Sequence, residues 1–66
     1  MTYINMENNM KYGVKLLTYD GQEFDTWVWD GDTRFETTII GHAEQWRDHM
    51  LAKNPKGHYV VHVIVD

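Results

Sequence analysis

The sequence predicts an α+β fold, with a three- or four-stranded, mostly antiparallel sheet and one helix packed on one face. Two observations carry this prediction. Two β-rich runs flank Asp20-Gly21, and this pair is a strong hairpin signal. Apolar residues then recur at helical spacing, before a last β-rich run. A chain of 66 residues allows one domain. We expect it to span residues 10–66, after a flexible N-terminal segment at 1–9 in which Tyr3 and Ile4 could add a short edge strand.

The first two strands are predicted at residues 11–19 and 22–30, joined by the Asp-Gly turn. Their register depends on the length of that turn. A two-residue turn pairs Val14 with Trp27, and a four-residue loop pairs Leu16 with Trp27. Both registers place the two tryptophans of the second strand on the face of Val14, whereas a three-residue loop breaks this pairing.

Phe24 and Val28 lie on the opposite face of the predicted hairpin. If the helix covers the Val14 face, which we favour, then Trp27 and Trp29 belong to the core. If the helix covers the other face, the two tryptophans become exposed anchors for a partner.

A second turn cluster at residues 30–33 precedes a Thr- and Ile-rich run at 34–40, which predicts a third strand or a strand that passes into the helix. The helix is predicted at residues 42–53, with Trp46 on its apolar stripe. An earlier start with Thr38 as N-cap would place a glycine inside the helix, at a cost of about 1 kcal/mol.

The last strand is predicted at residues 58–65. Tyr59, Val61, Val63 and Val65 share one of its faces, and further apolar residues lie on the other. Apolar side chains on both faces indicate a central strand.

Composition excludes several classes of function. Hydrophobic residues make up 42% of the chain and no cysteine is present, so a small core must stabilise the fold without disulfides. The net charge of −4, with no basic tract, argues against nucleic-acid binding. We find no signal peptide and no apolar run long enough to span a membrane, so we expect a cytoplasmic protein.

Six of the ten acidic residues fall within a stretch of 17 residues and alternate with aromatics. Such a segment can attract a basic partner and offer flat anchors to hold it. Two well-solvated turns would have the same composition. The candidate partner-binding residues are Asp20, Glu23, Asp25, Trp27, Trp29, Asp30, Asp32 and Glu36.

No catalytic or metal-binding motif is evident. His42 and His49 share a helix face but lack the zinc-helix spacing, while His58 and His62 lie about 13 Å apart along a strand. The carboxylates occur in turns, where acids cap and solvate the chain. We therefore expect neither catalysis nor a metal or other cofactor.

The order of strand, acidic turn, strand, helix and strand resembles small phage-encoded host-takeover proteins, and above all the T7-type inhibitor of bacterial RNA polymerase. The stretches that carry the resemblance are residues 25–29, the turn at 30–33, residues 35–39, the helix from Ala43 and residues 57–61. They cover about two-thirds of the chain. The resemblance implies a three-stranded antiparallel sheet on one helix, and a negatively charged strip that competes for a basic channel in the host cytoplasm. The additional strand at 11–19 departs from this pattern.

The sequence thus predicts a non-enzymatic protein-binding module, with a phage-encoded inhibitor as its most specific form. Its partner would be a host nucleic-acid-handling enzyme that presents a basic groove to the acidic, aromatic face. The alternative is a small assembly module that forms a homo-oligomer through a sheet face or edge, with the acids serving solubility alone.

Overall fold

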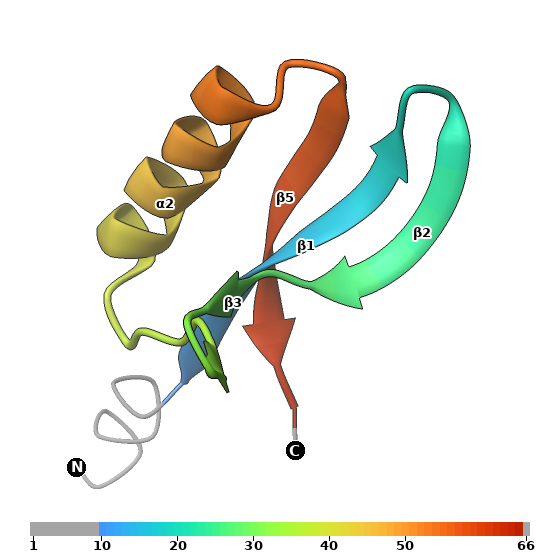
Figure 1. Cartoon of the computed structure of the whole chain (residues 1–66). Helices are drawn as coiled ribbons and strands as arrows, with labels where there is room; N and C mark the ends of the chain where they lie inside the picture. The colour runs from blue at the N-terminus through green and yellow to red at the C-terminus, as the bar shows by residue number, and fades with distance from the viewer. Residues whose placement is uncertain (1–9, 66) are drawn as a thin grey trace, which may run out of the picture.

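The computed structural model describes residues 10–65 and confirms the α+β class (Figure 1). A three-stranded antiparallel sheet has the order β2-β1-β5, and a short β3–β4 hairpin forms a second sheet. One helix, α2, packs against β1 and β5. The predictions for residues 1–9 lie outside the described part of the chain. The elements are β1 (Lys11–Tyr19), β2 (Gln22–Trp27), β3 (Trp29–Asp30), β4 (Thr33–Arg34), α2 (Ile40–Lys53) and β5 (Gly57–Ile64).

The predicted hairpin is present, and its turn is the two-residue form. Tyr19 pairs with Gln22, and both turn residues have positive φ, at 53° for Asp20 and 83° for Gly21. Positive φ at both central positions defines a type I′ turn, whose twist matches that of the flanking strands. The Asp-Gly signal therefore identified the turn correctly.

Both predicted registers for this hairpin are wrong beyond the turn. Trp27 pairs with Lys15, because the register shifts between Leu16 and Thr18. At this bulge one residue of β1 faces two residues of β2, Phe24 and Asp25. A shift by one residue moves every following side chain to the other face of the sheet. Trp27 consequently lies on the face opposite Val14.

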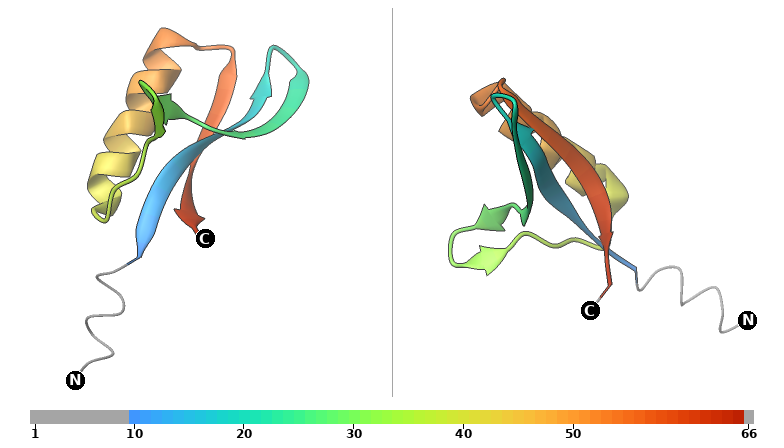
Figure 2. Two further views of the ribbon diagram at one scale, coloured as in Figure 1. Left: turned by 60° about the horizontal axis from the view of Figure 1, so that its bottom comes forward. Right: turned by 90° about the vertical axis from the view of Figure 1, so that its right-hand side faces the viewer.

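The chain leaves the edge of β1 after Val28 and returns to it at Thr37, with eight residues between these two points. The Val28 N–H donates to the Val14 carbonyl at 2.8 Å, and Thr37 exchanges hydrogen bonds of 2.7 and 3.0 Å with Tyr12. Residues 28 and 37 thus border the same edge of β1. The residues between them, 29–36, form an excursion that we call the arm, and Figure 2 shows its β3–β4 hairpin standing away from the main sheet.

The third strand predicted at residues 34–40 is wrong in its extent. β4 covers only Thr33–Arg34, and beyond it Thr37 makes a single bridge to β1. The arm turns at Gly31, where φ is 67°, and Asp30 pairs with Thr33. Glycine at the first central position of a two-residue loop is typical of a type II′ turn.

The helix α2 begins two residues earlier than the principal prediction. Its N-cap is Ile39, without a side-chain capping bond, so the prediction of Thr38 as N-cap is also wrong. The Ile39 N–H instead donates to the Thr37 hydroxyl at 3.1 Å. Gly41 accordingly lies within the first turn of the helix.

The core lies between α2 and the inner face of the sheet. Val14 is fully buried, and Val28 and Tyr59 are 7% and 6% exposed. Burial raises the pKa of the Tyr59 phenol above its ordinary value, and the neighbouring Tyr19 adds to this effect. The partly buried residues packed against this centre are Leu16, Phe35, Trp46, Met50 and Leu51, of which the last three lie on the predicted helical stripe.

The strand β5 is an edge strand of the described sheet, so the prediction of a central strand is wrong. The apolar residues on its two faces are therefore not explained by a central position in the sheet. Tyr59 faces the core, while Ile64 is buried on the outer face, where it would lie 3.1 Å from a Cβ added to Gly13. Aromatic cover on that outer face, rather than a further strand, removes it from solvent.

Candidate functional site

The arm brings together four of the predicted partner-binding residues, of which Glu36 lies at its base and the other three lie further out. Trp29 and Asp30 form β3, and Asp32 follows in the turn. Trp29 is 59% exposed, although tryptophan is among the residues that proteins usually bury. Neither Asp30 nor Asp32 makes an ion pair within residues 10–65. The arm therefore presents an uncovered indole beside two uncompensated carboxylates.

Ion pairs at the base of the arm join Arg34 to Glu36 and Glu36 to Lys11 of β1. The Arg34 guanidinium donates to one Glu36 carboxylate oxygen from Nε at 3.2 Å and from Nη2 at 2.8 Å. Lys11 lies 3.6 Å from the other oxygen of Glu36. The hydrogen bond from Arg34 holds the pKa of the Glu36 carboxyl below its ordinary value, and the charge of Lys11 assists. Glu36 is thus compensated by two basic side chains, unlike Asp30 and Asp32 among the described residues.

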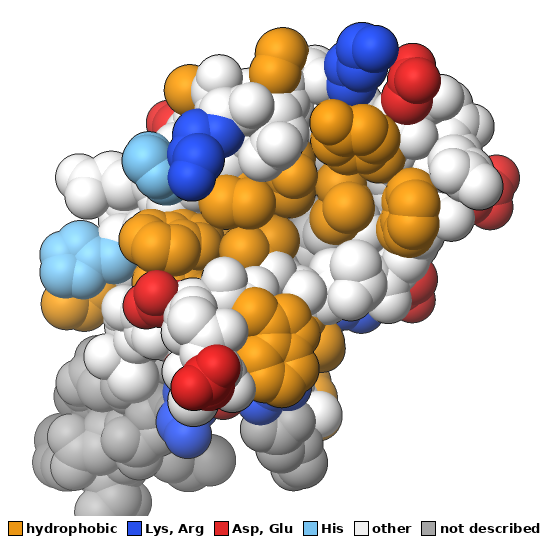
Figure 3. All heavy atoms as spheres, in the orientation of Figure 1, with side chains coloured by type: hydrophobic (Ala, Val, Ile, Leu, Met, Phe, Trp, Pro, Cys, Tyr) orange, Lys and Arg blue, Asp and Glu red, His pale blue; other side chains and the backbone are white. Residues whose placement is uncertain are grey.

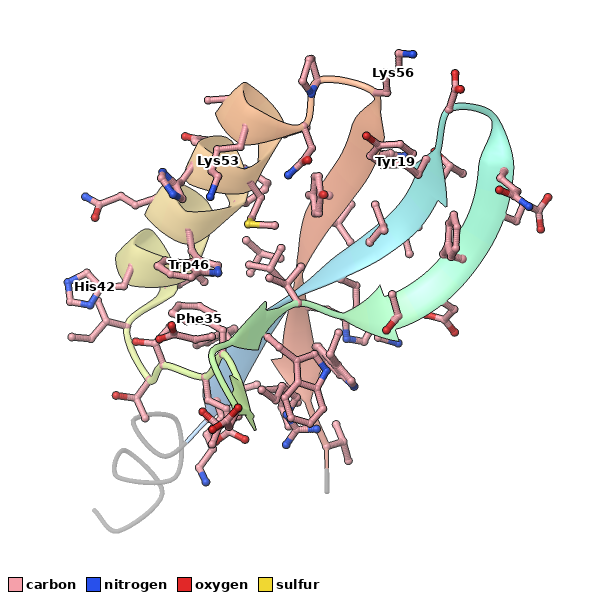
Figure 4. The ribbon with its side chains drawn as sticks, in the orientation of Figure 1. Tyr19, Phe35, His42, Trp46, Lys53 and Lys56 are labelled. Carbon is pink, nitrogen blue, oxygen red and sulfur yellow. The ribbon has the colours of Figure 1, made fainter. Side chains whose placement is uncertain are left out.

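An open hollow of about 410 Å³ lies along the arm. At this point the side chain of Phe35 points from the arm toward α2 and stacks on Trp46. The ring centroids lie 4.8 Å apart and the planes are inclined by 5° (Figure 4). The arm is therefore anchored to the core on one side and open on the other. The hollow is lined by Asp30, Thr33, Arg34, Phe35 and Glu36.

The remaining predicted acids do not join the arm. Asp20 lies in the β1–β2 turn, 4.0 Å from Lys56, and Asp25 lies on β2, 3.0 Å from Lys15. Glu23 is exposed near the turn and has no ion pair within the described part of the chain. On the side of the molecule drawn in Figure 3, the carboxylates are scattered rather than gathered in one strip.

Trp27 occupies a different environment from Trp29, so the prediction that both lie on the Val14 face is wrong. It is half-buried and lies over Gly13, where an added Cβ would come within 2.9 Å of the indole. Lys15 and Arg34 lie 4.8 and 5.2 Å from its ring, and His62 meets it edge-on at 5.8 Å. Trp27 covers the outer face of the sheet, and of the two tryptophans only Trp29 is left as an open anchor.

The sequence analysis missed two lysines that form ion pairs with the candidate acids, Lys11 and Lys15, whereas Arg34 lies within the acidic run itself. Lys11, Lys15 and Arg34 each pair with an acid of the candidate set. The Arg34–Glu36 spacing of two residues was a usable signal, because side chains two apart in an extended chain point the same way. The Lys15–Asp25 pair depends on the bulge and has no local signature.

A second hollow, of about 470 Å³, lies beside the first half of α2. It is lined by Phe35, His42, Gln45, Trp46 and His49. His42 and His49 share this side of the helix, as predicted. Among residues 10–65, no group of three or more His, Cys, Asp or Glu side chains is placed to hold a metal ion. No helix in the same range is long and apolar enough to cross a membrane.

Comparisons with known proteins give no assignment. No protein-family model, curated protein or solved structure matches the chain.

Proposed function

We propose that this chain is a non-enzymatic protein-binding module whose arm enters a basic groove on its partner. The observation that carries the proposal is the exposure of Trp29 beside Asp30 and Asp32, which lack ion pairs among the described residues. Exposed tryptophan is enriched at the energetic centres of protein interfaces. Flanking carboxylates would steer a basic surface toward the indole and accelerate association.

The partner proposed is a basic, nucleic-acid-handling enzyme of a bacterial host, which the chain would inhibit by occupying its groove. Support comes from the acidic balance of the chain and from the resemblance in element order to the phage inhibitors of RNA polymerase. The contact surface that we propose is smaller than the eight residues of the sequence analysis. Asp20 and Asp25 lie near lysines of the chain itself, so the arm is the stronger candidate.

The test compares two exposed aromatic residues. Immobilised wild-type chain would be exposed to a bacterial lysate at low and high salt, and the captured proteins identified by mass spectrometry. Trp29→Ala should reduce capture of the partner about tenfold or more, because the indole is the proposed anchor. Phe24→Ala is the matched control, since Phe24 is 42% exposed but lies on β2, outside the arm.

The salt series separates charge steering from other binding. Capture through the arm should weaken as salt rises, because screening shortens the reach of exposed charges to about 3 Å at 1 M. Equal capture by wild type and Trp29→Ala, or capture that does not respond to salt, would contradict the proposal.

A further inference from the structure

The outer edge of β5 is a long unpaired strand within the described residues. β5 spans eight residues and pairs on one side only, with β1. Proteins usually protect such edges with lysine, proline or a bulge, because the free N–H and C=O groups template pairing with another chain. β5 carries no lysine, arginine, carboxylate or proline.

The hydrogen bonds of β1 and its pairing with β5 show which backbone groups of β5 point away from the sheet. Tyr12 exchanges its hydrogen bonds with Thr37, and the Val14 carbonyl accepts from Val28, so both residues of β1 direct their groups away from β5. Their partners across the ladder are Val63 and Val61. In an antiparallel pair, residues that do not exchange bonds with the facing strand direct both groups to the other side.

The outer edge therefore presents the N–H and C=O groups of Val61 and Val63 and, by the same alternation, those of Tyr59. The Val63 carbonyl also lies 2.7 Å from Nδ1 of the exposed His62 ring. A second copy that runs antiparallel offers the same row in the opposite order. When Val61 pairs with Val61 of the second copy, and Tyr59 with its Val63, all of these N–H and C=O groups form hydrogen bonds on both copies.

Charge favours a second copy at this edge over any other part of the molecule. The net charge of −4 repels like chains. The candidate acids all lie on β2, the arm or the turns beside them, and residues 57–65 contain none. The sheet order places β5 at the edge opposite β2, so copies that meet at β5 keep their acidic segments far apart.

We propose that two copies of this chain pair through their β5 strands, to give one antiparallel sheet of the order β2-β1-β5-β5-β1-β2. The proposal is independent of the partner assigned to the arm. It has a consequence for binding, because the two arms lie at the two outer ends of the combined sheet. A partner with two basic sites would then gain avidity without any new contact.

The experiment measures the association state of the full chain over a dilution series by sedimentation velocity, together with amide hydrogen exchange. We expect a reversible dimer in which the Val61 and Val63 amides become protected as the concentration rises. His62→Lys places a charge on the exposed surface of β5 and should weaken the dimer about tenfold or more.

Gln22→Lys is the matched control, because it makes the same change of charge at an exposed position of β2. It should leave the dimer unchanged. A monomer at every concentration would overturn the proposal, as would a dimer without added protection at Val61 and Val63. Protection that is independent of concentration and disappears on deletion of residues 1–9 would also overturn it, because the chain itself would then occupy the edge.

Discussion

Phe35 and Trp29 lie six residues apart on the same arm, and the fold treats them in opposite ways. Phe35 stacks on Trp46 against the core, whereas Trp29 is 59% exposed. Their difference follows from the backbone. The Phe35 N–H donates to the Val28 carbonyl at 3.1 Å, next to the point where the chain rejoins β1, while Trp29 lies where the chain has left the sheet. The contact with α2 separates the two residues, because Phe35 packs on Trp46 whereas Trp29 remains exposed to solvent.

The largest expected effect is a loss of folding stability when the aromatic residue in the core, Trp46, is removed rather than the exposed Trp29. Trp46→Ala should destabilise the domain by about 3–5 kcal/mol, because it removes both the stack on Phe35 and contacts with the core. That loss equals the whole stability expected of so small a core, so the variant should be unfolded. Trp29→Ala should change the free energy of unfolding by less than about 1 kcal/mol.

Urea unfolding followed by circular dichroism measures both variants. Cooperative unfolding of Trp46→Ala near the wild-type urea midpoint would show that the contact between α2 and the arm contributes little. A large loss in Trp29→Ala would show that the arm belongs to the core.

A second prediction concerns the outer face of the sheet, where Trp27 lies on Gly13. Gly13→Ala places a Cβ 2.9 Å from the indole and 3.1 Å from Ile64, and should destabilise by about 1–3 kcal/mol through overpacking. Gly41→Ala is the control, since its Cβ would meet no atom within 4 Å in a helical position. It should be neutral or stabilising by up to about 1 kcal/mol. Thermal melts that rank the two glycine variants the other way would refute the packing of Trp27.

A smaller effect is expected from the charges at the base of the arm. The pKa of Glu36 is lowered in the folded state, so its contribution to stability is present above the ordinary glutamate pKa of about 4.3. It is lost as the pH falls through the lowered folded value. Glu36→Gln should therefore flatten the acid side of the stability profile slightly. Glu23→Gln, at an exposed position without an ion pair in the described part of the chain, should leave the profile unchanged.

Much of this fold follows from local signals in the sequence. The Asp20-Gly21 turn, the strand at Lys11–Tyr19 and the helical stripe around Trp46 each depend on residues near one another in the chain. The bulge opposite Leu17 has no such signal. It arises where β1 meets β2 and β5 together, and it moves Trp27 to the other face.

The candidate site was predictable in composition but not in arrangement. The run of acids identified Asp30 and Asp32, which the arm presents to solvent. The sequence could not show that Lys15 and Lys56 lie beside two of the other acids, because these pairs join residues that are distant in the chain. The sequence did not reveal the edge position of β5 either, because Trp27 reaches over Gly13 from β2 to the outer face of β5, where it meets His62.

The exposed part of the arm, Trp29 to Asp32, is proposed to bind a partner and to contribute little to folding. The most direct test of this proposal is the double variant Asp30→Lys and Asp32→Lys, which changes the net charge from −4 to 0 because each exchange adds two units. The corresponding Asn variant keeps the turn preference and removes the charge. Association of each variant with the captured partner would be measured at low and high salt, alongside thermal unfolding. The account predicts stability within about 1 kcal/mol of wild type, and an association rate at least about tenfold slower at low salt that recovers as salt screens the charges. An unchanged association rate in a folded lysine variant would contradict it.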